Sequence, residues 1–198
     1  MSLLDGVTVL AVDTETTGMN PAEGHRLVEV AHVAIVGGAL GAEWSSLVDP
    51  RRPIPPDASR VHGITDTMVT GAPSMAEVGR VLRAACGDLP LVFHNAPFDL
   101  PFLVHLFREA GAPPLTNPIV DTLGLARGLF GASGNKLTEL QVKLQLPPET
   151  AHRALGDTRT TARVFQTLAA RWEQEKGVRS IAELAAASQD VMRATARR

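Results

Sequence analysis

Two acidic residues lie two positions apart near the start of the chain, in the segment Asp-Thr-Glu-Thr-Thr-Gly at residues 13–18. The preceding residues 7–12 are apolar and β-branched, which indicates a buried strand. Side chains at i and i+2 of a strand share one face, so Asp13 and Glu15 present two carboxylates side by side. A hard cation such as Mg²⁺, bound through oxygen, would relieve their repulsion. The alternative is a pair of solvated acidic residues at the end of a strand.

A second candidate segment, Asn-Ala-Pro-Phe-Asp at residues 95–99, follows the apolar run 89–93. Asp99 would leave the carboxyl end of a strand, where α/β sheets place their ligand sites. The segment also has a purely structural interpretation. Asn95 could cap a helix, proline suits its first turn, and Asp99 would interact favourably with the helix dipole.

The third segment is His-Arg-Ala-Leu-Gly-Asp at residues 152–157. In one continuous helix, five steps of about 100° would leave His152 and Asp157 about 140° apart, too far to share a site. Gly156 and the prolines at 147–148 instead predict that His152 lies in a loop and that Asp157 opens the last long helix. The loop could then fold His152 over a metal site. Otherwise His152 is an exposed loop residue and Asp157 an ordinary helix-start acid.

The periodicity of the chain predicts the elements that would position these residues. A capping box of Ser74 and Glu77 starts a helix that runs to about residue 85. Strands before alternating strands and helices predict an α/β domain with helices covering its sheet. Strands are expected at 7–12, 27–36, 43–48, 89–93 and 119–121, and further helices at 99–110, 123–130, 137–144 and 157–172.

Residues 1–176 are predicted to form this domain and residues 177–198 a C-terminal helical extension. Ser180 and Glu183 form a second capping box, which starts a helix in the extension. The extension could pack on the domain or dock on a partner, and its sequence does not choose between them.

The composition restricts the class of protein. The 198 residues carry 19 basic and 21 acidic side chains, a net charge of −2, so binding of nucleic acid through a broad basic face is not expected. A single cysteine excludes an internal disulfide, and no Cys/His cluster has zinc-ligand spacing. The chain contains no apolar run long enough to indicate a membrane partner or a leader. A cytoplasmic location is therefore expected.

Taken together, the three segments resemble the motifs of the DEDDh family, the RNase H-like 3′→5′ exonucleases that include the epsilon proofreading subunit of bacterial DNA polymerase III. Their order and spacing agree, as do the intervening segments Val-His-Gly-Ile-Thr at 61–65 and Val-Asp-Thr-Leu at 120–123. The resemblance extends over residues 7–172. It implies an RNase H-like mixed five-stranded sheet flanked by helices.

The resemblance also implies a mechanism. Two divalent cations, Mg²⁺ or Mn²⁺, would lie among Asp13, Glu15, Asp99 and Asp157, and His152 would act as general base. The products would be nucleoside 5′-monophosphates from the 3′ ends of single-stranded or frayed DNA, in replication proofreading or repair. A sister group has a tyrosine in place of the histidine. The chain contains no tyrosine, so it does not belong to that group.

Contacts with the substrate follow from the resemblance as well. The backbone and side chains around Thr16 and Thr17 would hold the terminal nucleotide, and His62 would approach the 3′ end. Phe98 could stack on a base, although core packing is the alternative, and Asn95 could donate to the substrate or only cap its helix. Asp121 is expected to support the site from outside.

Three other functions remain open. An RNA-trimming enzyme similar to RNase T or oligoribonuclease would use the same five catalytic residues, because ribose recognition depends on contacts near the 2′ position. The first motif and the His-Gly-Ile-Thr segment look more like the proofreading branch, which favours DNA. An RNase H endonuclease is disfavoured, because such enzymes lack the Asp-x-Glu pair and the third motif. The last possibility is a mainly structural subunit bound to a DNA polymerase catalytic subunit.

Overall fold

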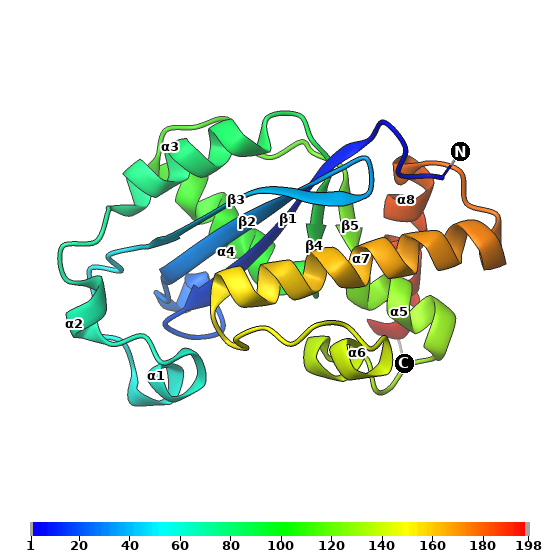
Figure 1. Cartoon of the computed structure of the whole chain (residues 1–198). Helices are drawn as coiled ribbons and strands as arrows, with labels where there is room; N and C mark the ends of the chain where they lie inside the picture. Colours follow the sequence, from blue (N-terminus) through cyan, green and yellow to red (C-terminus); the bar gives the residue numbers. More distant parts are fainter. Residues whose placement is uncertain (1, 197–198) are drawn as a thin grey trace.

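A mixed five-stranded sheet forms the centre of the protein (Figure 1). The computed structural model describes residues 2–196. The sheet has the order β3-β2-β1-β4-β5, in which β1 pairs antiparallel with β2 and parallel with β4. This confirms the predicted fold class. The strands are β1 (Thr8–Thr16), β2 (Leu27–Val36), β3 (Ala39–Leu47), β4 (Leu91–Phe93) and β5 (Ile119–Asp121).

Helices cover both faces of the sheet, and the central strand β1 is buried between them. Val9 and Ala11 point into a core under α7 (Ala154–Lys176), whereas Leu10 and Val12 point into a second core under α3 (Met75–Cys86) and α4 (Ala96–Glu109). A strand buried on both faces needs apolar residues at every position. Burial on both faces therefore explains why residues 9–12, just before Asp13, are all apolar.

The remaining helices lie around the ends of the sheet. They are α1 (Pro56–His62), α2 (Asp66–Val69), α5 (Thr122–Phe130), α6 (Leu137–Lys143) and α8 (Ile181–Ala196), with a 3-10 turn at Pro21–Glu23. The sequence pattern predicts no helix over the residues of α1 or α2. Each of the two buries a single residue, so neither has a periodic apolar face that could reveal it. No helix of the described part of the chain is both long and apolar enough to cross a bilayer.

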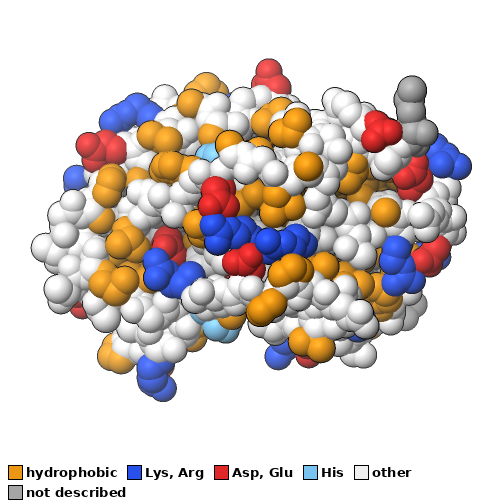
Figure 2. Space-filling model, viewed as in Figure 1, with side chains coloured by type: hydrophobic (Ala, Val, Ile, Leu, Met, Phe, Trp, Pro, Cys, Tyr) orange, Lys and Arg blue, Asp and Glu red, His pale blue; other side chains and the backbone are white. Residues whose placement is uncertain are grey.

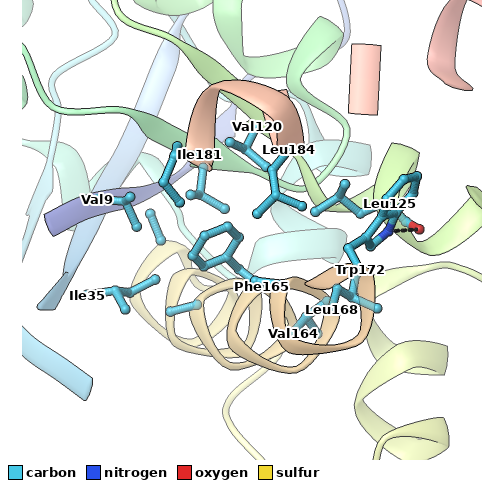
Figure 3. Close-up of a cluster of buried hydrophobic side chains, with 14 of the residues drawn as sticks. Val9, Ile35, Val120, Leu125, Val164, Phe165, Leu168, Trp172, Ile181 and Leu184 are labelled. Carbon is cyan, nitrogen blue, oxygen red and sulfur yellow. Dashed lines mark hydrogen bonds between the residues drawn. The ribbon is translucent and has the colours of Figure 1, made fainter. Parts of the chain in front are cut away.

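The C-terminal extension packs on the domain. Ile181 and Leu184 of α8 belong to the same core as Phe165 of α7, toward which they are turned in Figure 3. In that core Trp172 donates from Nε1 to the carbonyl oxygen of Leu125 at 3.0 Å. Helix α8 thus shares the hydrophobic core of the domain. The boundary at residue 177 stays a prediction from the sequence.

A glycine allows α8 to approach α5 closely. A Cβ at Gly124 would lie 2.3 Å from the carbonyl oxygen of Ser188, which is shorter than any real contact. Ser188 in turn accepts a hydrogen bond from the backbone N–H of Asp121 at 3.1 Å. The edge of the sheet at β5 is thus covered and held by α8.

Several boundaries differ from the predicted ones where distant residues intervene. Strand β1 continues to Thr16 because it pairs with β2 along its whole length, so Asp13 and Glu15 lie inside the strand. Helix α7 begins at Ala154, so the prediction that Asp157 opens this helix is wrong. The reason is that Glu29 on β2 accepts the N–H of Ala154 at 2.9 Å and so caps the helix from another element.

Candidate active site

Three carboxylates from two elements converge at one point. Asp13 and Glu15 extend from β1, and Asp157 lies in the first turn of α7. One carboxylate oxygen from each residue lies within 4.8 Å of the others, and all three side chains are half-buried. The tertiary structure therefore joins the first and third sequence motifs, which are more than 130 residues apart, in a cluster of oxygen ligands.

Burial and mutual repulsion disfavour the ionised forms of this cluster. Burial, followed by the charges of Asp99 and Glu15, raises the pKa of Asp13 well above its usual range. Burial and the charge of Asp157 raise the pKa of Glu15 to about 8, and burial raises the pKa of Asp157. Oxygen-only donors with uncompensated negative charge fit a hard divalent cation, which would hold all three carboxylates ionised. The three carboxylates are therefore chemically suited to bind a divalent metal ion.

Asp99 lies beside this group rather than in it. Its side chain is buried on α4, where Oδ1 accepts a hydrogen bond from Oγ1 of Thr14 at 2.7 Å. Burial raises the pKa of Asp99 to about 7, against the opposing effect of the Thr14 hydrogen bond. Its charge nevertheless contributes to the raised pKa of Asp13. The structure therefore gathers three of the four predicted carboxylates within 4.8 Å and places the fourth next to them.

The turn that delivers Asp99 is held by Asp121. Oδ1 of Asp121 accepts the backbone N–H groups of Asn95 at 3.0 Å and Leu123 at 2.9 Å, and Oδ2 accepts that of Ala96 at 2.9 Å. Asn95 has a φ of 71°, a left-handed conformation that needs such support. Asp121 therefore fixes the start of α4, in keeping with its expected position outside the site.

His152 lies in the loop before α7, as the sequence predicts. Its φ is 57°, and its backbone N–H donates to Oδ2 of Asp157 at 3.0 Å. A Cβ at Gly156 would lie 2.1 Å from the carbonyl oxygen of Thr150, so only glycine lets the loop fold against the first turn of α7. His152, Asp13 and Asp157 line one cavity of about 680 Å³.

Two residues that sequence reasoning missed hold this loop. Glu29 of β2 lies directly opposite Glu15 and is 4% exposed. Its carboxylate accepts two hydrogen bonds from the guanidinium of Arg153, at 2.7 and 3.1 Å, in addition to the N–H of Ala154. The partners are 124 residues apart, so spacing cannot reveal the pair. The available signal is a charged residue inside the apolar run of β2.

Thr16 and Thr17, expected near the terminal nucleotide, have hydroxyl groups that serve the protein itself. Oγ1 of Thr16 donates to the carbonyl oxygen of Gly18 at 2.7 Å. Oγ1 of Thr17 accepts the N–H of Arg26 at 3.0 Å and contacts Nδ1 of His25 at 3.2 Å. Both threonines are buried, so their side chains shape the loop after β1.

The other three predicted substrate residues have different surroundings. Asn95 is exposed and makes no side-chain capping bond, and Phe98 is half-buried with its ring 5.6 Å from that of Phe102. Both line the cavity of the carboxylates. His62 is buried, and its Nδ1 accepts the N–H of Ile64 at 3.0 Å. Its Nε2 is buried without a hydrogen-bond partner in the described part of the chain.

A mixed sheet whose central strand carries carboxylates with raised pKa values beside a third acidic residue is an arrangement that suits metal-dependent hydrolysis. Residues 10–165 match the sequence model of the Exonuclease family, and the chain belongs to this family. It is 44% identical over 170 residues to the DNA polymerase III subunit epsilon-like protein of Rhodobacter capsulatus, covering 83% of this chain and 24% of that protein. It is 34% identical over 174 residues to DNA polymerase III subunit epsilon of Treponema pallidum, covering 86% and 80%.

A solved structure supports the same assignment. Exonuclease X in complex with 5′ overhanging duplex DNA superposes with a TM-score of 0.71 at 28% identity, covering 89% of this chain and 99% of that one. The resemblance to 3′→5′ exonucleases is thus confirmed at the level of family and fold. The chain spans about a quarter of the length of the Rhodobacter relative, so the partners and substrates of whole relatives are not transferred directly.

Proposed function

We propose that the protein is a divalent-metal-dependent 3′→5′ exonuclease that releases nucleoside 5′-monophosphates from single-stranded or frayed DNA. The observation that carries the proposal is the convergence of Asp13, Glu15 and Asp157, two of which, Asp13 and Asp157, line one cavity with His152. Relatives named DNA polymerase III subunit epsilon, and the similarity to Exonuclease X bound to DNA, favour DNA over RNA and a role in proofreading or repair.

Asp13, Glu15 and Asp157 would hold one cation, and Asp13 with Asp99 a second, both Mg²⁺ or Mn²⁺. Bound there, such ions lower the pKa of water and neutralise charge on the phosphate and the leaving oxygen. The raised pKa values of Asp13 and Glu15 support this assignment, because burial and like charges disfavour their ionised forms and a bound cation would stabilise those forms.

His152 is the general base in this proposal. Its imidazole lies at the exposed wall of the cavity, and its backbone is fixed by the bond to Asp157. The imidazole takes the proton from a water whose oxygen attacks phosphorus in line, while the bond from phosphorus to the 3′ oxygen breaks. The 3′ oxygen leaves with the shortened strand, and the terminal residue departs as a 5′-monophosphate.

The terminal nucleotide would be held by Asn95, Phe98 and His62, with the loop at Thr16 and Thr17 shaping its pocket. Phe98 presents an aromatic face for stacking on a base of any sequence. Burial lowers the pKa of His62, and its Nδ1 is an acceptor. The neutral ring therefore carries its proton on Nε2, a buried donor close to the backbone of Thr16 that would suit a hydroxyl or phosphate oxygen of the terminal nucleotide.

The test offers 5′-labelled DNA and RNA oligonucleotides to the wild type and to Asp13→Ala, with Mg²⁺, with Mn²⁺ or with EDTA. We expect metal-dependent shortening from the 3′ end, faster for DNA, and its loss in the variant. Cleavage in EDTA, or an Asp13→Ala variant as active as the wild type, would contradict the mechanism. Faster RNA trimming would keep the mechanism and assign the protein to the RNase T or oligoribonuclease type.

We also propose association with a DNA polymerase catalytic subunit in the cytoplasm, where a free thiol such as that of Cys86 stays reduced. Deleting residues 177–198 cannot test this, because Ile181 and Leu184 belong to the core. Size-exclusion chromatography of the full chain mixed with such a subunit can. Co-elution of both wild type and Asp13→Ala would support the association, and separate elution would exclude it. Co-elution without hydrolysis by the wild type would favour the mainly structural role.

A further inference from the structure

The cavity lined by Asp13 and Asp157 has a second wall that takes no part in the proposed hydrolysis. This wall, which we call the α5–α6 wall, is formed by the end of β4, by α5 and by the loop into α6. Its polar side chains are His94, Arg127, Asn135 and Lys136. A strand whose 3′ end reaches Asp13 must leave through the same cavity, with one phosphate for each nucleotide.

The positive charges of the α5–α6 wall lack acidic partners. Among residues 2–196, neither Arg127 nor Lys136 forms an ion pair. Glu139 also lines the cavity, but its carboxylate accepts the backbone N–H of Lys136 at 2.8 Å and so caps α6. By contrast, Arg159 and Arg163 of α7 pair with Glu43 or Glu149.

Figure 2 shows the surface that carries α7. Basic and acidic side chains alternate there, and no broad patch of one sign is visible. His94 adds no charge to the α5–α6 wall, because burial lowers its pKa to about 4. The positive charge facing the cavity from this wall therefore comes from Arg127 and Lys136.

Asn135 provides an independent observation. It is 3% exposed, and its Nδ2 donates to the carbonyl oxygens of Gly131 at 2.7 Å and Ser133 at 3.0 Å. Its Oδ1 is buried with no hydrogen-bond partner in the described part of the chain. Buried polar atoms in native proteins are nearly always paired, so this acceptor, on a residue that lines the cavity, is left for a donor that the described chain does not supply.

Helix α8 fixes the orientation of Arg127. One terminal nitrogen of the guanidinium donates to Oγ1 of Thr195 at 3.1 Å and contacts the sulfur of Met192 at 3.4 Å. Nε of Arg127 is buried without a partner among the described residues. The planar guanidinium is thus held at the wall, and its second terminal nitrogen makes no hydrogen bond among the described residues, so it is the donor that suits a phosphate oxygen.

We propose that the α5–α6 wall is a strand-binding subsite, at which Arg127 and Lys136 contact the phosphodiester backbone on the 5′ side of the terminal nucleotide and Asn135 accepts a hydrogen bond from an N–H group of a base in that strand. The proposal rests on the exonuclease function proposed above. It accounts for strand binding by a protein whose net charge is −2, because two local cations and the metal site provide positive charge where the strand lies.

The first experiment measures binding without hydrolysis. Fluorescence anisotropy of a labelled oligothymidylate of roughly 20 nucleotides is followed in EDTA over a range of salt concentrations. Each phosphate contact with a single strand contributes about 0.7 to the slope of log affinity against log salt. We expect Lys136→Ala and Arg127→Gln each to weaken binding about 3- to 10-fold and to reduce that slope by about 0.7, whereas Lys176→Ala, on the exposed end of α7, changes neither.

The second experiment separates the subsite from the catalytic centre. The p-nitrophenyl ester of thymidine 5′-monophosphate has no nucleotide on the 5′ side, so it reports only on the metal site. Lys136→Ala should keep wild-type hydrolysis of this ester and raise KM for the oligothymidylate. Equal losses on both substrates, or wild-type affinity and salt slope in both variants, would overturn the subsite. A wild type that hydrolyses neither substrate would refute the proposed function, and the binding result would still decide the subsite.

Discussion

Two neighbouring strands of the sheet carry carboxylates that face each other, Glu29 on β2 and Glu15 on β1, and their surroundings differ. Glu29 on β2 receives both a guanidinium from Arg153 and a backbone N–H. Glu15, directly opposite it on β1, lies with Asp13 and Asp157 in a cluster whose pKa values are raised by burial and by like charges. Glu29 is paired with a guanidinium, whereas the other three carboxylates form no ion pair with Lys or Arg among the described residues.

Glu29 stabilises the structure around the site, whereas the cluster of Asp13, Glu15 and Asp157 provides the proposed metal site. Pairing Glu29 with Arg153 fixes the loop of His152 and the start of α7, so it positions Asp157 against β1. Leaving the cluster unpaired destabilises the metal-free protein but creates a site with affinity for a divalent ion. If this interpretation is correct, changes at the two groups should have opposite effects on stability.

The largest effect is expected for Asp13→Asn. Activity should fall by about 10³-fold or more, because stabilisation by the bound cations is worth several kcal/mol. In EDTA near pH 8 the variant should melt at a higher temperature than the wild type, since it lacks one of the repelling charges. Oligonucleotide hydrolysis and thermal melts with and without Mg²⁺ measure both. Asp57→Asn, at an exposed position on α1, serves as control, and an undiminished gain in melting temperature with Mg²⁺ in Asp13→Asn would contradict the metal site.

His152→Asn should lower kcat by about 10²- to 10⁴-fold, the usual contribution of a general base. Asparagine tolerates the left-handed backbone at this position, so the loop should keep its shape. The rise in melting temperature on adding Mg²⁺ should therefore match that of the wild type. His105→Gln on α4, away from the cavity, is the control. Near-normal turnover in His152→Asn would remove His152 from the chemistry.

Arg153→Met should destabilise the protein by about 1–3 kcal/mol, because it leaves the buried carboxylate of Glu29 without its main partner. Activity or metal affinity should fall about 10- to 100-fold, as for other residues that orient metal ligands. Urea unfolding and metal titration measure the two effects. The double variant Glu29→Gln/Arg153→Met should recover stability. A matched surface change, Arg193→Met, breaks an exposed pair with Asp190 and should cost less than about 1 kcal/mol.

The smallest expected effect is the pH dependence of the metal-free protein. The pKa of Glu15 rises from 4.5 to about 8 on folding, and that of Asp99 from 3.8 to about 7. Protons on these groups therefore stabilise the fold, and that stability is complete below their unfolded pKa values and is lost as the pH rises through about 7 and 8. The melting temperature in EDTA should fall by a few degrees between about pH 5 and pH 8.5, and saturating Mg²⁺ should abolish the decline. A rise over this range in EDTA would contradict the assignment.

The sequence predicts the fold class because the five strands and the main helices carry local apolar patterns. Helices α1 and α2 are too short for such a pattern, and α7 begins three residues before Asp157 because its cap comes from Glu29 on another strand. The predicted position of His152 in a loop agrees with the structure, since Gly156 and two prolines are local signals. Contacts between distant segments, such as Glu29 with Arg153, have no local signal.

The sequence alone thus determined the residue types and order of the three motifs and the loop position of His152. Only the tertiary structure decided which carboxylates meet, which one is neutralised, and that α8 joins the core and holds Arg127. The reason is physical. Periodicity and turn residues act over a few positions, whereas electrostatic compensation and burial depend on the groups that the fold brings within a few ångströms.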